Sequence, residues 1–111
     1  MLFALYGVMQ VKFRTYEFSV QFARLCRTLD VPPDLKDQLD RASASITLNL
    51  REGSGRYTPK DRFRFYRTAL SSFRECEAIF DIIDLKNEKV NELKNTLGGS
   101  LNCLCRATKP Q

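Results

Sequence analysis

The sequence predicts an all-α protein, an antiparallel up-down-up-down four-helix bundle. Apolar residues recur at helical spacing in four segments, and proline or glycine separates these segments. The alternation typical of strands never lasts, and no Asn-Gly or Asp-Gly hairpin turn occurs in the sequence. Four amphipathic helices joined by short connections bury their apolar faces against one another as a bundle.

The first two helices are expected over residues 12–30 and 34–52, with Pro32 and Pro33 between them. The first helix has one apolar face, formed by Phe18, Phe22, Leu25 and Leu29. The second helix buries Leu35, Leu39, Ala42, Ile46 and Leu50. Gly53 is expected to end the second helix, because glycine adopts the left-handed conformation without steric cost.

The third helix begins at a capping motif, Thr58-Pro59-Lys60-Asp61, in which a proline follows the cap and a carboxylate comes three residues after it. Its apolar face comprises Phe63, Tyr66, Leu70, Phe73, Phe80 and Ile83. The fourth helix, over residues 88–106, has a near-heptad stripe of Val90, Leu93, Leu97, Leu101 and Leu104. Gly98 and Gly99 interrupt this stripe, which indicates either a close helix contact or a bend.

The chain of 111 residues predicts a single domain over residues 12–106, with an extension at 1–11 and a tail at 107–111. The apolar extension has no preceding positive charge and no cleavage site, so a signal peptide is disfavoured. It is an ordered extension or a translation start placed too early, since Met9 precedes the first helical pattern. No apolar run reaches about 18 residues, so we expect a cytoplasmic protein without a membrane span.

The residue types disfavour an enzyme, a metal site or a cofactor. The chain has no histidine, and Cys26, Cys76, Cys103 and Cys105 lack the C-x-x-C repeat of zinc sites. We therefore expect reduced thiols in the core. A nuclease is the enzyme alternative, but no clustered carboxylates accompany the basic residues, and no catalytic residue is proposed.

Positive charge is concentrated in residues 51–67, which carry six basic and two acidic side chains in a chain of net charge +5. A solvated face or salt bridges between subunits would explain this charge. Nucleic-acid binding is the alternative, since arginine predominates and Tyr57, Phe65 and Tyr66 could stack with bases, unless the last two belong to the core. The candidate nucleic-acid-binding residues are Arg51, Arg56, Lys60, Arg64, Arg67 and Arg74.

A second polar stripe lies along the second predicted helix at spacings of three, four, four and three. It consists of Gln38, Arg41, Ser45, Asn49 and Glu52. At the border of the core these groups can form hydrogen bonds with a neighbouring helix or subunit. A ligand site and a nucleic-acid contact are the alternatives.

Three segments, Gln38–Ala42, Ser45–Arg56 and Ser72–Glu75, resemble the signature of the bacterial four helix bundle protein family, also called 23S rRNA intervening-sequence proteins. The central motif is approximately S-I-x-x-N-I-x-E-G-x-G-R, and the resemblance runs from about residue 13 to residue 104. The motif adds Ser72 and Glu75 to the polar network or interface.

Two residues depart from the family pattern: Leu50 replaces the usual isoleucine, and Arg51 stands where a small residue is common. Membership implies a ring-like homo-oligomer, with a pentamer as the expected assembly, and implies no reaction. Members are encoded within insertions in ribosomal RNA genes. A similar branch, which Leu97-Gly98-Gly99 faintly resembles, comprises accessory proteins of diversity-generating retroelements, whose basic ring surfaces bind nucleic acid and a reverse transcriptase.

From the basic residues, together with the oligomer that the resemblance implies, we expect a non-enzymatic oligomer that binds structured RNA or DNA through its basic face. The alternative is a protein-interaction adaptor that docks a reverse transcriptase. The motif at residues 49–56 favours the ribosomal-insertion branch and the first of these functions.

Overall fold

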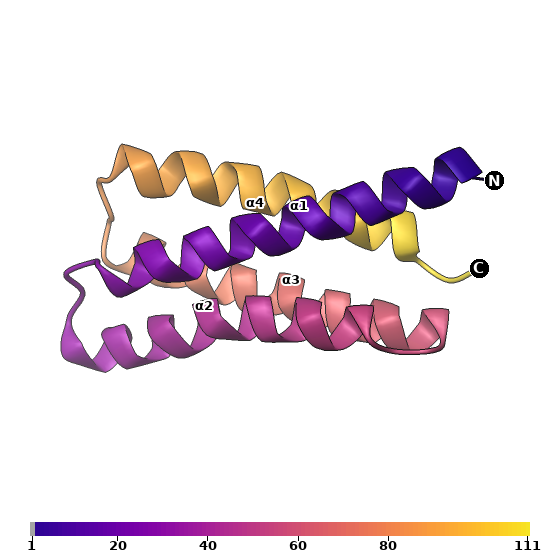
Figure 1. Ribbon diagram of the computed structural model, residues 1–111. Coiled ribbons are helices and arrows are strands. Elements are labelled where there is room, and N and C mark those ends of the chain that lie inside the picture. Colours follow the sequence, from indigo (N-terminus) through magenta and orange to yellow (C-terminus); the bar gives the residue numbers. More distant parts are fainter. Residues whose placement is uncertain (1) are drawn as a thin grey trace.

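A computed structural model of the chain describes residues 2–111, with side chains from residue 6 onward. The chain forms four helices: α1 (Leu2–Arg27), α2 (Pro33–Ser54), α3 (Pro59–Ile82) and α4 (Glu88–Thr108). They run alternately in opposite directions along one long axis (Figure 1). No strand occurs in residues 2–111, so the predicted all-α four-helix bundle is confirmed.

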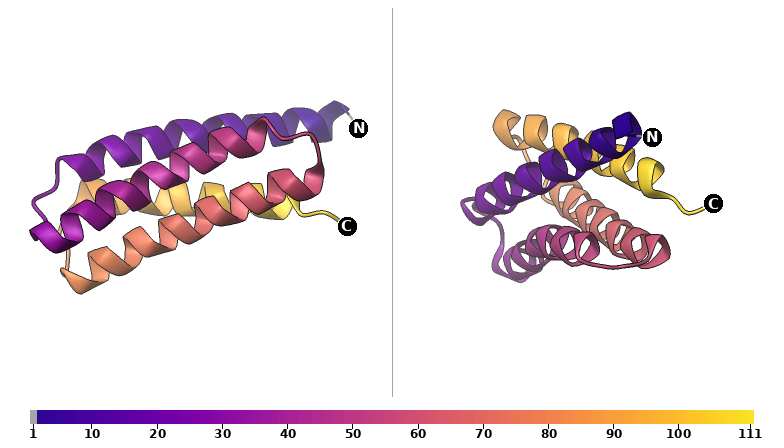
Figure 2. Two further views of the ribbon diagram at one scale, coloured as in Figure 1. Left: turned by 90° about the horizontal axis from the view of Figure 1, so that it is seen from below. Right: turned by 45° about the vertical axis from the view of Figure 1, so that its right-hand side comes forward.

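The helices pack as a square in which each contacts two neighbours, α1 and α3 both lying against α2 and α4. The bundle measures 47 × 23 × 20 Å. The α1–α2 and α3–α4 connections lie at one end of its long axis, as both views of Figure 2 show. The opposite end, here called the terminal end, holds the α2–α3 connection, the start of α1 and the end of α4 (Figure 1).

The core has three aromatic rings at its centre. The Phe22 ring of α1 lies 5.9 Å from that of Phe73 and 6.0 Å from that of Phe80, measured between centroids. Both partners belong to α3, so these contacts cross the bundle axis between helices that are not neighbours. Leu39 of α2 and Leu97 of α4 are also fully buried, and the core therefore joins all four helices.

Side-chain caps define where the third and fourth helices begin. Thr58 Oγ1 accepts a hydrogen bond of 3.1 Å from the backbone N–H of Asp61, with Pro59 at the first helical position. Asn87 Oδ1 accepts one of 3.1 Å from the backbone N–H of Val90. Each cap satisfies a donor that has no partner within the helix. The predicted start of the third helix is confirmed.

The first helix begins earlier than expected. α1 starts at Leu2, so the described part of the predicted extension continues the helix upstream of residue 12, while residue 1 lies outside the described residues. The helix ends at Arg27, three residues before the expected end. Within residues 2–111, no helix is long and apolar enough to cross a membrane, α1 included.

The buried face of α1 is also more polar than expected. Thr15 and Ser19 are fully buried, in line with Phe22 and Cys26, whereas Phe18 is only half-buried. The Thr15 hydroxyl donates to the Val11 carbonyl, and Ser19 Oγ donates to a carbonyl one turn back. A hydroxyl group whose hydrogen bond is made to a backbone carbonyl can lie in a core. The spacing of apolar residues alone therefore predicted the buried face of α1 incorrectly.

The expected role of Gly53 is wrong. α2 continues through Ser54, and Gly53 is a buried helical residue without positive φ. A Cβ atom at Gly53 would lie 2.7 Å from Cε1 of Tyr66, so the position requires glycine because α3 approaches closely. Gly98 has the same role on α4, where a Cβ would lie 3.0 Å from the Phe73 ring, but a Cβ at Gly99 would meet nothing within 4 Å.

The four cysteines are free thiols, and three of them lie in the core. Burial raises the pKa of Cys26 to about 12 and also raises the pKa of Cys76 and of Cys105. Cys103 is exposed, so its expected place in the core is wrong. It lies one residue before the core residue Leu104, and a rotation of about 100° per residue turns it outward.

Replacing Gly53 with alanine is expected to destabilise the fold by about 1–3 kcal/mol, because the buried Tyr66 ring leaves no room for the added methyl group. Urea unfolding followed by circular dichroism measures this change. Gly99→Ala is the matched control, expected to raise stability by about 1 kcal/mol through helix propensity alone. Equal effects at both positions would contradict the close approach of α3 to α2.

Candidate nucleic-acid interface

Part of the predicted polar stripe joins α2 to α3 within one chain. Ser45 Oγ and Ser72 Oγ lie 2.8 Å apart across the contact between the two helices. Asn49 Nδ2 donates to the Ser45 carbonyl at 2.8 Å and to Ser45 Oγ at 3.0 Å. These three residues therefore form a hydrogen-bonded network that needs no second subunit.

Five of the seven predicted network residues also line an open groove between α2 and α3, with a volume of about 390 Å³. These five residues are Gln38, Arg41, Ser45, Ser72 and Glu75. Arg41 forms an exposed ion pair of 2.6 Å with Asp37. Glu52, in the last turn of α2, does not line the groove and instead pairs at 2.5 Å with Arg56 of the α2–α3 connection.

Four of the six predicted nucleic-acid-binding residues form an exposed surface on α3, here called the α3 cationic face. Its members are Lys60, Arg64, Arg67 and Arg74. Arg64 has a long ion pair of 3.5 Å with Asp61. Among residues 2–111, no salt bridge involves Lys60, Arg67 or Arg74. Three positive charges on this face therefore remain uncompensated within the described chain.

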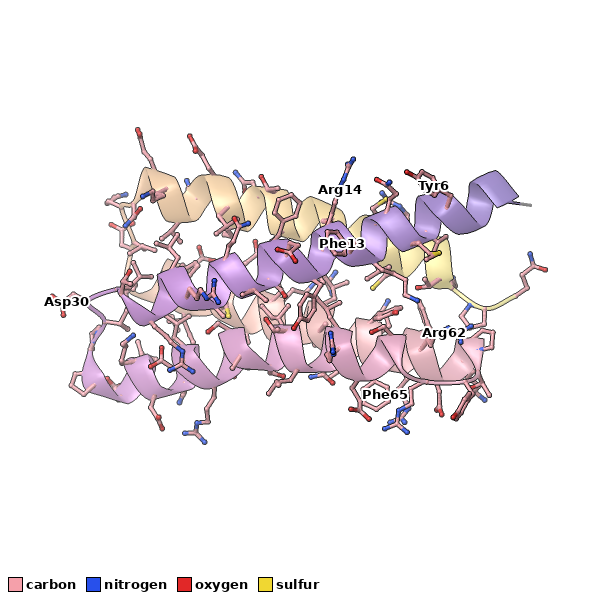
Figure 3. The ribbon with its side chains drawn as sticks, viewed as in Figure 1. Tyr6, Phe13, Arg14, Asp30, Arg62 and Phe65 are labelled. Carbon is pink, nitrogen blue, oxygen red and sulfur yellow. The ribbon has the colours of Figure 1, made fainter. Side chains whose placement is uncertain are left out.

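A half-buried aromatic ring lies beside this face. Cζ of Arg56 lies 4.6 Å, and Cζ of Arg64 4.7 Å, from the centroid of the Phe65 ring, within cation–π range. Figure 3 shows Phe65 pointing away from the bundle. Tyr66, its neighbour in sequence, is 1% exposed and belongs to the core, so the stacking role considered for Tyr66 is wrong. Tyr57 is 98% exposed on the α2–α3 connection.

Arg51 does not join the other predicted cations. It lies on the α1 side of α2, where its Cζ is 5.8 Å from the centroid of the Tyr16 ring. Glu52 instead pairs with Arg56, whose guanidinium lies over the Phe65 ring of α3. Adjacent residues in a helix differ by about 100° in direction, so Arg51 and Glu52 diverge.

Arg62, which the sequence analysis did not include among the candidate nucleic-acid-binding residues, has a structural role. Its Nη1 donates to the carbonyls of Arg56 and Tyr57 at 3.0 and 3.1 Å, which fixes the α2–α3 connection against α3. It points towards α1, whereas Phe65 points outward (Figure 3). A basic residue at this position carries no signal of such a role in the sequence, because its partners are backbone atoms.

In the described part of the chain, no three histidine, cysteine, aspartate or glutamate residues gather closely enough to hold a metal ion. Arginine and lysine side chains of this kind offer hydrogen-bond donors and positive charge to phosphate oxygens.

Comparisons with known proteins give one match. The model of a family described as "23S rRNA-intervening sequence protein" matches residues 9–105. No curated protein and no solved structure matches the chain. The matched range includes every residue of the polar stripe and of the basic set.

A double-mutant cycle tests the contact between Ser45 and Ser72. Ser45→Ala and Ser72→Ala are expected to show a coupling of about 1 kcal/mol in urea unfolding, because either change removes the same hydrogen bond. The control pairs Ser45→Ala with Ser71→Ala, an exposed neighbour, and is expected to couple by less than about 0.3 kcal/mol. Equal coupling in the two cycles would disprove the bond.

Proposed function

The chain belongs to the family of 23S rRNA-intervening sequence proteins, and from this membership we propose that it is a non-enzymatic cytoplasmic homo-oligomer that binds structured RNA or DNA. The proposed contact surface is the α3 cationic face. Arg51 of α2 and Arg56 of the α2–α3 connection extend the proposed set.

The observation that carries this proposal is the uncompensated charge of Lys60, Arg67 and Arg74. Exposed cations that have no carboxylate partner among residues 2–111 are available to phosphate oxygens. Binding of phosphate releases condensed counterions from the nucleic acid, which favours association at low salt. Arg56 and Arg64 add guanidinium groups held in place by the Phe65 ring.

A ring-like homo-oligomer, in the proposed case a pentamer, would repeat this face several times. Repetition converts weak contacts of one subunit into high avidity, provided that the ligand reaches several copies. Exposed Tyr6, Met9 and Phe13 lie at i, i+3 and i+7 of α1 and give each subunit an apolar line suited to burial against protein. Light scattering of the purified protein measures the number of subunits.

The apolar line on α1 also favours the second candidate function, an adaptor that docks a partner enzyme such as a reverse transcriptase. Protein interfaces bury aromatic residues and methionine at their centres. In that case the partner contacts α1, and the α3 cationic face contributes little to binding.

Removing the charges at Lys60, Arg67 and Arg74 by substitution with glutamine is expected to weaken RNA binding and flatten its dependence on salt. If the three side chains contact single-stranded RNA, where about 0.7 counterions are released per contact, the slope of log affinity against log salt should fall by about 2. Fluorescence anisotropy with labelled ribosomal RNA fragments, titrated over a series of salt concentrations, gives both quantities.

A control variant carries the same change in charge on α1 and α4: Arg14→Gln, Arg24→Gln and Lys89→Gln. It is expected to keep the salt slope of the native protein within about one unit. Equal losses of RNA affinity in the two variants would show that only the net charge of the protein matters, and not the position of the three cations. Native protein that shows no binding at low salt would leave the adaptor function as the better explanation.

A further inference from the structure

A cavity of about 320 Å³ lies near the terminal end, apart from the α3 cationic face. All four helices contribute to its wall. The residues that matter for its chemistry are Lys12, Tyr16, Glu17, Arg51, Ser54 and Tyr66. Leu50 and Leu104 add apolar surface. The volume lies at the lower limit of ligand pockets, which suits one small ligand and excludes a folded peptide.

The Tyr66 hydroxyl is a buried donor without a partner. The residue is 1% exposed, and its hydroxyl oxygen forms no hydrogen bond in the described chain. Burial raises the pKa of Tyr66 to about 12, while the charge of Arg62 opposes this rise, so the hydroxyl keeps its proton at neutral pH. Buried hydroxyl groups are normally satisfied, so this donor, which other atoms cover behind the cavity wall, could pair with an acceptor of a ligand once those atoms move aside.

The cavity has an excess of positive charge. Lys12 and Arg51 line it and form no salt bridge within residues 2–111, while Glu17 is the carboxylate in the wall. Burial and the positive charge of Arg62 both lower the pKa of Lys12. An anionic group placed between Lys12 and Arg51 would compensate this charge.

An aromatic surface completes the site. The Tyr16 ring lies in the wall, with the Arg51 guanidinium 5.8 Å from its centroid, and this ring can stack with a flat aromatic group. A ligand that satisfies all parts of the wall therefore has a flat ring with a polar edge and an attached anion. A nucleotide combines these features.

We propose that this cavity holds one unstacked nucleotide, with its base against Tyr16, a base-edge acceptor bound by the Tyr66 hydroxyl and its phosphate between Lys12 and Arg51. This inference rests on the proposed nucleic-acid binding and extends it from phosphate contacts to a base. Bases splayed out of single-stranded loops are recognised in this manner in RNA.

Free mononucleotides test the cavity independently of RNA. Isothermal titration calorimetry of the full chain with AMP and with UMP is expected to show one site per subunit. Adenosine tests the contribution of the phosphate, while inorganic phosphate and benzoate test whether an anion alone or any aromatic acid suffices. Binding of AMP is also expected to raise the pKa of Lys12, measured by NMR of the labelled ammonium group, because the phosphate favours the charged form.

Tyr66→Phe removes only the hydroxyl and is expected to weaken AMP and UMP about tenfold. Because that hydroxyl has no partner in the described chain, the variant loses no internal hydrogen bond and should fold. Tyr57→Phe, at a fully exposed tyrosine, is the matched control and leaves binding unchanged. Arg51→Gln is expected to weaken AMP about tenfold while leaving adenosine unchanged.

The outcomes separate this inference from the proposed function. Loss of RNA binding in the variant at Lys60, Arg67 and Arg74, with AMP binding retained, supports a separate base site. Salt-dependent RNA binding without any binding of AMP or UMP at millimolar concentration overturns the cavity assignment alone. Phosphate or benzoate binding as tightly as AMP overturns the nucleotide assignment. AMP binding that depends on Tyr66, in a protein that binds no RNA, supports the ligand class and overturns the proposed function.

Discussion

The contact between Gly53 and the ring of Tyr66 determines how α2 and α3 meet at the terminal end. The ring occupies the space where any other residue at position 53 would place its Cβ atom. With Tyr66 in the core, its predecessor Phe65 must face outward, where it meets Arg56 and Arg64. One close backbone approach thus determines which aromatic ring is buried and which one holds the exposed guanidinium groups.

The same packing separates the polar groups of α2 into two functional sides. Ser45 faces α3 and joins the two helices through its hydroxyl contact with Ser72, while the Asn49 amide donates to Ser45 within α2. Arg51 faces α1 and lines a cavity with Tyr16. A helix of this length presents different chemistry to each neighbour, so a motif that is continuous in sequence serves separate structural purposes.

Sequence periodicity was sufficient for the helices and for the cap at Thr58, because both depend on residues close together in the chain. It failed where distant residues decide the outcome. The role of Gly53 depends on a ring thirteen residues later, and the buried Thr15 and Ser19 depend on hydrogen-bond partners that spacing does not reveal. The spacing of basic residues in the sequence was enough to predict the α3 cationic face. It could not show that Arg51 lies apart from this face, because that depends on where α1 packs. The cavity beside Tyr66 is lined by residues of all four helices, so no local sequence pattern predicts it.

The first and last helices pack against each other and bring both chain ends to the same end of the bundle (Figure 1). A short linker could therefore join them, and new ends could be opened in the connections at residues 28–32 or 83–87, which lie at the far end. Circular permutation of this kind is tolerated when it cuts exposed connections and leaves the core intact. A domain fused before α1 or after α4 would lie at the terminal end, whereas one fused to the new ends would lie at the opposite end of the bundle. The choice of cut could therefore position a tethered reporter or enzyme at either end.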